Sequence, residues 1–342
     1  MLGAAVDGDA DRSGGLQSFI IAVIVFTVTS ISLRFWSRSL AWHDPAMRDN
    51  RLFWWDDWFA LGAALLLLAQ VTTGLVAIHI AGFGKHLSTL SPEQFKLFFK
   101  LLYAGTFFFF TAVSFTKFSV LFFLSRVFPP HVNTRWYNYS IWACYALNTA
   151  WIVGITFAAV FLCDPVQKNW DPTLKGSCGT DYNLYLGNAI PDAIIDLAIL
   201  LLPLPKLWVL HISMKKKLAL AVIFILGYGV VAVSIGRFIQ IAQIGDGIND
   251  DITWAAIPVF FWISAEPGIS ILCACLPALL PLCRKLAQRY PFTHRSRSDI
   301  SKQGDSFYAS RQDKYSSKDS EEIPFSSRNG ISASLKPESF AV

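Results

Sequence analysis

The sequence has few charged residues. Asp, Glu, Lys and Arg together make up 15% of its 342 residues, whereas hydrophobic residues make up 54%. A soluble domain usually carries about 25% charged residues, so this composition excludes an ordinary soluble protein. The apolar residues are gathered in long runs before residue 283, and the polar ones follow that position.

Seven of the apolar runs are long enough to cross a bilayer, which takes about 20 residues in a helix. The runs span residues 16–36, 55–80, 96–125, 138–162, 184–206, 217–244 and 254–283. The sequence therefore predicts an all-α, polytopic bundle of seven transmembrane helices over residues 16–285. Residues 1–15 are predicted to form a short extracellular N terminus. The serine-rich residues 286–342 are predicted to be a disordered cytosolic tail, because they cannot bury enough apolar surface to fold.

The start of the chain lacks the positive charge that opens a signal peptide. It contains one arginine, and no small-residue cleavage site follows the first apolar run. We therefore expect that run to remain as the first helix.

Lysine and arginine alternate in number between successive loops, and their excess marks the cytosolic side. Residues 34–51 contain four, 126–135 two and 206–217 four, and the chain beyond Cys283 contains eleven. The loops between them contain none, one or two. The pattern predicts that the N terminus is outside and the C terminus is cytosolic.

Two of the six cysteines, Cys163 and Cys178, fall in a predicted outer loop, where the environment permits oxidation. A disulfide between them would close a loop of about 15 residues and stabilise the protein by about 3 kcal/mol. Two free thiols are the alternative.

Ionisable residues inside membrane helices usually face the bundle interior and are paired. This sequence has five of them: Lys117, Asp192, Asp196, Arg237 and Glu266. A rise of about 1.5 Å per residue places Lys117 and Asp196 at about 13 and 15 Å from the cytosolic side, so these two can pair. Arg237 and Glu266 lie at about 30 and 27 Å, and Asp192 lies between the two levels, so Arg237 is expected to pair with Glu266 or with Asp192.

Three interpretations of these five charges remain open. The pairs can fix the register of the helices only, or they can line a polar pocket that a ligand disturbs. Ion conduction is the third. At the cytosolic ends, Asp56 and Asp57 can meet Arg34 or Arg126, or face the interface. Arg126, with Asp56 and Asp57, is also a candidate for coupling to a heterotrimeric G protein. An ordinary positive-inside charge at the membrane interface is the alternative for Arg126.

Short motifs along the chain resemble the fungal rhodopsin-domain integral membrane family. They are WWDDWF (54–59), GFGKH (82–86), KFSVLFFLSRVF (117–128), FLCDPVQKNW with a later cysteine (161–178), PDAIIDLAILLLPLPKLWVL (191–210), SIGRF (234–238), DITW with a later glutamate (251–266) and CLPALLPL (275–282). Each motif is weak alone, but eight in order are specific, and the resemblance covers residues 17–285. The family includes receptor-like proteins of filamentous fungi related to appressorium-surface sensors. It also includes membrane proteins encoded beside toxin-biosynthesis genes.

The resemblance implies a receptor-like protein that senses an extracellular or membrane-partitioned ligand through a pocket between helices 3, 5, 6 and 7. An accessory role in the biosynthesis or export of a secondary metabolite is the alternative. No retinal is expected, because the last helix (254–283) has no lysine for a Schiff base. The expected partners are the lipid bilayer, an unknown small-molecule or surface ligand and a G protein, and not nucleic acid. The plasma membrane is the expected location, and an internal membrane is the alternative.

Enzymatic activity is not expected. The six histidines avoid mid-membrane depth, so the sequence offers no intramembrane zinc site and we expect no bound metal. No Gly-x-Ser-x-Gly nucleophile motif is present either. A transporter would usually show an internal repeat, and the two halves of this chain show none.

Overall fold

The computed structural model describes residues 13–42, 52–86, 89–129, 133–171, 173–205, 214–244 and 252–289. They form seven helices that are each long and apolar enough to cross a membrane. The predicted all-α fold of seven transmembrane helices is thereby confirmed, and the chain is an integral membrane protein.

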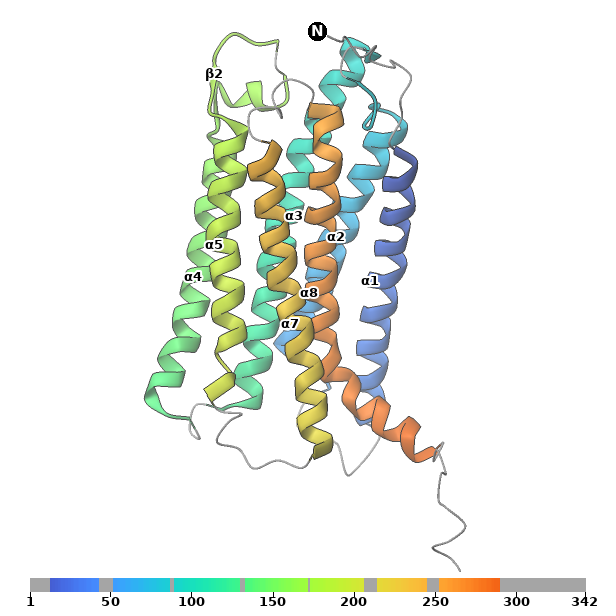
Figure 1. Cartoon of the computed structure of the whole chain (residues 1–342), viewed down its shortest axis with the longest axis vertical. Helices are drawn as coiled ribbons and strands as arrows, with labels where there is room; N and C mark the ends of the chain where they lie inside the picture. The colour runs from blue at the N-terminus through green and yellow to red at the C-terminus, as the bar shows by residue number, and fades with distance from the viewer. Residues whose placement is uncertain are drawn as a thin grey trace, which may run out of the picture. The chain divides into compact units, whose positions relative to one another are not determined.

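The seven helices lie side by side as a bundle (Figure 1). They are α1 (Ser13–Trp42), α2 (Trp55–His79), α3 (Pro92–Val127), α4 (Arg135–Val160), α5 (Asp181–Leu201), α7 (Met214–Ile244) and α8 (Ile252–Arg289). Three short elements lie between α4 and α5: β1 (Cys163–Asp164), the 3-10 helix η2 (Val166–Asn169) and β2 (Ser177–Cys178).

Most helices are longer than the apolar runs that predict them. α1 begins at Ser13, inside the predicted N-terminal segment, and α8 continues to Arg289, beyond the predicted end of the bundle. Helical hydrogen bonds can continue past the hydrocarbon layer, so apolar length alone underestimates a membrane helix. α5 is shorter than predicted and ends at Leu201, two residues before Pro203, which has no backbone N–H to continue the helical hydrogen bonds.

The chain divides into two units, Met1–Leu286 and Ala287–Val342. The first unit contains the bundle up to the last turn of α8. Of the second unit only residues 287–289 are described, as the end of α8. The predicted disorder of the tail therefore lies outside the described residues, except for its first four residues, 286–289, which are helical.

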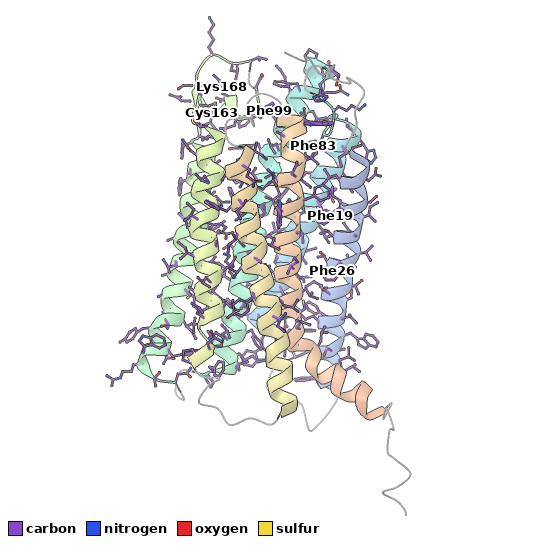
Figure 2. All side chains as sticks on the ribbon, viewed as in Figure 1. Phe19, Phe26, Phe83, Phe99, Cys163 and Lys168 are labelled. Atoms are coloured by element: carbon purple, nitrogen blue, oxygen red, sulfur yellow. A yellow bond between two sulfur atoms is a disulfide. The ribbon has the colours of Figure 1, made fainter. Side chains whose placement is uncertain are left out.

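Two apolar clusters hold the bundle together. One joins α1, α2 and α8 through residues such as Leu16, Leu67 and Ile271, which are fully buried. The other joins α3, α4 and α5 through Leu121, Tyr137 and other buried side chains. Large apolar side chains such as Phe26 point away from the bundle, as expected for a surface that faces lipid (Figure 2).

A disulfide between Cys163 and Cys178 closes the loop between α4 and α5, which confirms the prediction. The two cysteines are also paired in register by the antiparallel strands β1 and β2. Lys96 on α3 lies 3.0 Å from Asp171 and ties this loop to the bundle. Hydrogen bonds from Thr173 and then from Lys96 lower the pKa of Asp171.

The orientation in the membrane can be tested with two matched cysteine variants. Glu93 and Arg135 are both exposed near helix N-termini, but at the predicted outer and cytosolic ends respectively. We expect a membrane-impermeant maleimide to label Glu93→Cys in intact cells, and Arg135→Cys only after permeabilisation. Labelling of Arg135→Cys alone in intact cells would show the opposite orientation.

Candidate functional site

The centre of the bundle contains a network of ionised side chains around Asp192 on α5. One carboxylate oxygen of Asp192 lies 2.7 Å from Lys117 Nζ on α3. The other lies 2.6 Å from Arg237 Nη2 on α7. Lys117 also donates a hydrogen bond to the backbone carbonyl of Asp192 at 2.8 Å. Asp192 therefore joins three helices through one fully buried side chain.

Two further carboxylates complete this network. Asp196 lies one turn along α5 and 2.9 Å from Lys117, while Glu266 on α8 lies 3.1 Å from Arg237. Between them, Ser234 Oγ lies 2.7 Å from a Glu266 oxygen and 3.1 Å from an Asp196 oxygen. We call Lys117, Asp192, Asp196, Ser234, Arg237 and Glu266 the central network.

The structure thus brings together all five intramembrane charges that the sequence singles out, from four helices. Lys117 pairs with Asp196 at the depth expected, and Arg237 takes both of its expected partners, Asp192 and Glu266. Each side chain is 10% exposed or less. A buried charge without a partner costs several kcal/mol, so these groups depend strongly on one another.

Aromatic rings cover both cations. Lys117 Nζ lies 5.5 Å from the centre of the Trp151 ring, and the Arg237 guanidinium lies 5.0 Å from the centre of the Phe109 ring. Cations at such distances are attracted by the negative face of the ring. Both rings are buried, and the exclusion of water around the network strengthens its electrostatic interactions.

A cavity of about 60 Å³ lies beside the central network, towards the predicted outer end. Its walls come from α2, α3, α5, α7 and α8 and are mostly apolar, with Phe98, Phe109 and Phe260 among them. Phe83 closes it near the loop after α2, at the end of the bundle where Cys163 also lies (Figure 2). Gly82 and Gly84 flank Phe83 with positive φ angles of 71° and 105°, which favour glycine and explain the GFGKH motif.

Three buried polar side chains line this cavity and carry atoms without a hydrogen-bond partner among the described residues. They are Gln70 through Oε1, Asn188 through Oδ1 and Arg237 through Nε. All three side chains are at most 2% exposed. Arg237 is the only one of them that also belongs to the central network.

A second cluster of charges lies at the other end of the bundle from the cavity, where the C-terminal part of α1 meets the start of α2. Arg34 lies 2.7 Å from Asp56 and 2.8 Å from Asp57, and Arg38 lies 3.0 and 3.2 Å from the same two residues. Arg126 at the end of α3 lies 3.7 Å from Asp56. We call Arg34, Arg38, Asp56, Asp57 and Arg126 the inner cluster.

Helix geometry places the two aspartates of the inner cluster. Asp56 and Asp57 lie in the first turn of α2, where negative charge is favoured by the helix dipole. Asp57 accepts a hydrogen bond from the Trp54 backbone N–H at 3.1 Å and so caps the helix. The positive-inside count includes Arg34 among the charges of the cytosolic side, but its side chain lies within the bundle on α1 and is 1% exposed. One of the four positive charges counted over residues 34–51 is therefore buried in the bundle, where it has a structural role.

The inner cluster also reaches α3 and α8 through hydrogen bonds. Arg34 donates to the backbone carbonyl of Ala274 at 2.5 Å, and Ser37 donates to that of Ala278 at 2.6 Å. Ser119 on α3 donates to the backbone carbonyl of Asp56 at 2.7 Å. Four helices therefore meet at this end.

The fold and these two buried charge networks define a seven-helix integral membrane protein. The family model for the fungal rhodopsin domain matches residues 33–285, so the chain belongs to that family, as its motifs predict. No solved structure matches the chain significantly.

The chain is similar to three fungal proteins. One is the polyenoic acids biosynthesis gene cluster protein Ba17b of Metarhizium anisopliae, 28% identical over 79% of this chain and 74% of that protein. Another is the wortmanamides biosynthesis cluster protein C of Talaromyces wortmannii, 26% identical over 67% of this chain and 62% of that protein. The third is a SAT4 family membrane protein of Emericella nidulans, 29% identical over 58% of this chain and 49% of that protein. The last two alignments therefore cover less than two thirds of those relatives.

The family name raises the question of a retinal Schiff base, and the residues present do not fit one. The membrane-spanning part of α8, Thr253–Leu279, contains no lysine. Lys117 is buried on α3, where its ammonium contacts two carboxylates and a carbonyl. It is not among the residues that line the cavity.

The three carboxylates of the central network lie close enough to hold a metal ion, with one oxygen from each within 4.8 Å of the others. Lys117 and Arg237 already supply positive charge to these same groups. The arrangement is therefore explained by internal ion pairs and does not require a metal.

Several residues of the site have no signal in the sequence. Gln70, Asn188 and Ser234 are ordinary polar residues in apolar helices, and nothing in their spacing indicates that they meet. Asn188 could have been found from its position one turn before Asp192, which places both on one face of α5. Trp151 and Phe109 could not be distinguished from the many other aromatic residues.

Proposed function

We propose that this protein is a receptor-like membrane protein in which a small molecule bound in the cavity alters the central network. The position of Arg237 is the observation that supports this proposal, because its guanidinium both lines the cavity and holds Asp192 and Glu266. A guanidinium has five N–H donors in a fixed plane. A ligand that draws one of them towards the cavity therefore shifts the geometry of the others.

Two helices can carry such a shift to the other end of the bundle. On α3, Lys117 belongs to the central network, and Ser119, two residues later, bonds to α2 in the inner cluster. On α8, Glu266 belongs to the central network, and the carbonyl of Ala274 accepts from Arg34. Coupling between distant sites requires physically connected elements of this kind.

The inner cluster is the proposed region of coupling to a cytosolic partner. Arg126 is 20% exposed there and lies 4.7 Å from the centre of the Trp54 ring. A heterotrimeric G protein is the partner that a receptor-like role implies, and the plasma membrane is the matching location. We propose no catalytic role for any residue of the two networks.

An accessory role in secondary metabolism is the second candidate. It is favoured by the names of two of the relatives, the cluster proteins for polyenoic acids and wortmanamides biosynthesis. In that role the cavity would bind a pathway metabolite, and the central network would change during its handling. Both candidate functions use the cavity as the binding site. They differ in the step that follows binding, which is signalling to a cytosolic partner in the first and handling of the metabolite in the second.

A reporter assay separates them. The full-length protein is expressed in yeast with a G-protein-coupled reporter and exposed to culture extracts of the fungus that makes it. We expect extract-dependent activation that is lost in Arg237→Gln and kept in Thr27→Val, a buried position on α1 outside the cavity. Absence of activation by any extract, with product accumulating inside a deletion strain, would contradict the receptor and favour the accessory role.

A further inference from the structure

We infer that the cavity takes a neutral, compact and mainly apolar molecule that carries a hydroxyl group and a second acceptor oxygen. This inference rests on the proposed function, since it names the class of ligand for the same cavity. It is carried by the three cavity-lining side chains with atoms that lack a partner among the described residues: Gln70, Asn188 and Arg237.

These three atoms form a specific pattern of donors and acceptors. Arg237 Nε offers one N–H, and the side-chain carbonyl oxygens of Gln70 and Asn188 each accept a hydrogen bond. Buried polar atoms in proteins are nearly always satisfied, so three such side chains lining one cavity indicate a partner that completes them. A hydroxyl can donate to an amide oxygen while a second oxygen accepts from Arg237.

The charges around the cavity favour a neutral ligand. The central network has two cations and three carboxylates, a net charge of −1 when all are ionised. A carboxylate beside Arg237 would add a second negative charge in a region of low dielectric constant. An ammonium would meet the guanidinium of Arg237, because none of the three carboxylates lines the cavity. Both kinds of ion are therefore disfavoured.

The other walls of the cavity and its volume determine the apolar character and the size of the ligand. Aromatic and aliphatic side chains such as Phe83, Leu101 and Ile241 form most of the surface, so most of the ligand must be apolar. The 60 Å³ of free space is enough for about four to six water molecules. At about one non-hydrogen atom per water, that corresponds to a molecule of roughly four to six non-hydrogen atoms.

Three probes of equal non-hydrogen atom count test this class: 4-hydroxybutan-2-one, butanoate and hexane. Binding is measured by ligand-observed NMR and by the unfolding temperature of the full-length protein in nanodiscs, with empty nanodiscs as the blank. We expect the hydroxyketone to bind and to raise the unfolding temperature, and the other two to bind at least tenfold more weakly.

Two variants locate the binding, and a third is the matched control. Asn188→Leu and Gln70→Met each remove one unpaired oxygen and are expected to weaken hydroxyketone binding by about tenfold. Without ligand they should be at least as stable as the wild type, because an unsatisfied buried group is removed. Thr27→Val removes a buried hydroxyl that also lacks a partner among the described residues but does not line the cavity, and it should leave binding unchanged.

Several results would overturn the inference. They are tighter binding of butanoate or hexane, equal binding of the hydroxyketone to the wild type and to both cavity variants, or no binding of any probe, which would mean that water alone fills the cavity. The proposed function fails separately. If extracts activate the reporter in the wild type but not in Arg237→Gln, and the hydroxyketone does not bind, the proposed function stands and only the ligand class is wrong.

Discussion

Replacement of Arg237 by methionine is expected to lower the free energy of unfolding by about 3–5 kcal/mol. The substitution keeps an unbranched side chain of similar length but removes the cation that holds Asp192 and Glu266. Glu266, which is 1% exposed, then keeps no cation among its described partners. The charge of the central network changes from −1 to −2, counted over its two cations and three carboxylates. Equilibrium unfolding in mixed micelles measures the loss.

Glu266→Gln is the matched control for this prediction. It removes one carboxylate from the same pair, but Arg237 keeps Asp192 at 2.6 Å and the amide can still accept from Ser234. We expect it to cost clearly less than Arg237→Met. Equal losses in the two variants would show that the pair acts through packing alone and not through charge.

Replacement of Asp57 by alanine, in the inner cluster, is expected to lower the free energy of unfolding by about 3–5 kcal/mol. Asp57 is fully buried and accepts from Arg34 at 2.8 Å and Arg38 at 3.2 Å. It also caps α2 through the Trp54 N–H, and the loss of such a cap alone costs about 1 kcal/mol. The same unfolding experiment tests this value.

Arg38→Met provides the comparison for the inner cluster. Arg38 contacts the same two aspartates as Arg34 but is 15% exposed, so water replaces part of what it supplies. We expect a loss of about 1 kcal/mol or less, in the range of exposed ion pairs. A loss as large as that of Asp57→Ala would contradict the view that burial determines the strength of these contacts.

The fold could be predicted from the sequence because the bilayer imposes a strong rule. A membrane segment must satisfy all its backbone hydrogen bonds internally, so a long apolar run can only be a helix. The ends of the helices are set by other interactions. α1 continues beyond the predicted end at residue 36, where Arg38 pairs with Asp56 and Asp57, and no hydropathy scale contains that information.

The charged part of the site could be anticipated for a similar reason. Ionised groups in a membrane must find one another, so depth along each helix was enough to relate Lys117 to Asp196. Depth does not fix the rotation of a helix, so the sequence left open whether Arg237 pairs with Asp192 or Glu266, and the structure has both pairs. The cavity and the unpaired oxygens of Gln70 and Asn188 depend on the packing of five helices, which no local pattern encodes.

The most direct measurement of the central claim is a double-mutant cycle on Lys117 and Asp196, read by unfolding of the full-length protein. Lys117→Met leaves Asp196 without its cation, whereas Lys117→Met combined with Asp196→Asn restores the original net charge. If the buried charges form one interdependent network, the double variant should be more stable than Lys117→Met alone. The coupling free energy should then be about 1–3 kcal/mol. Losses that simply add would contradict the account.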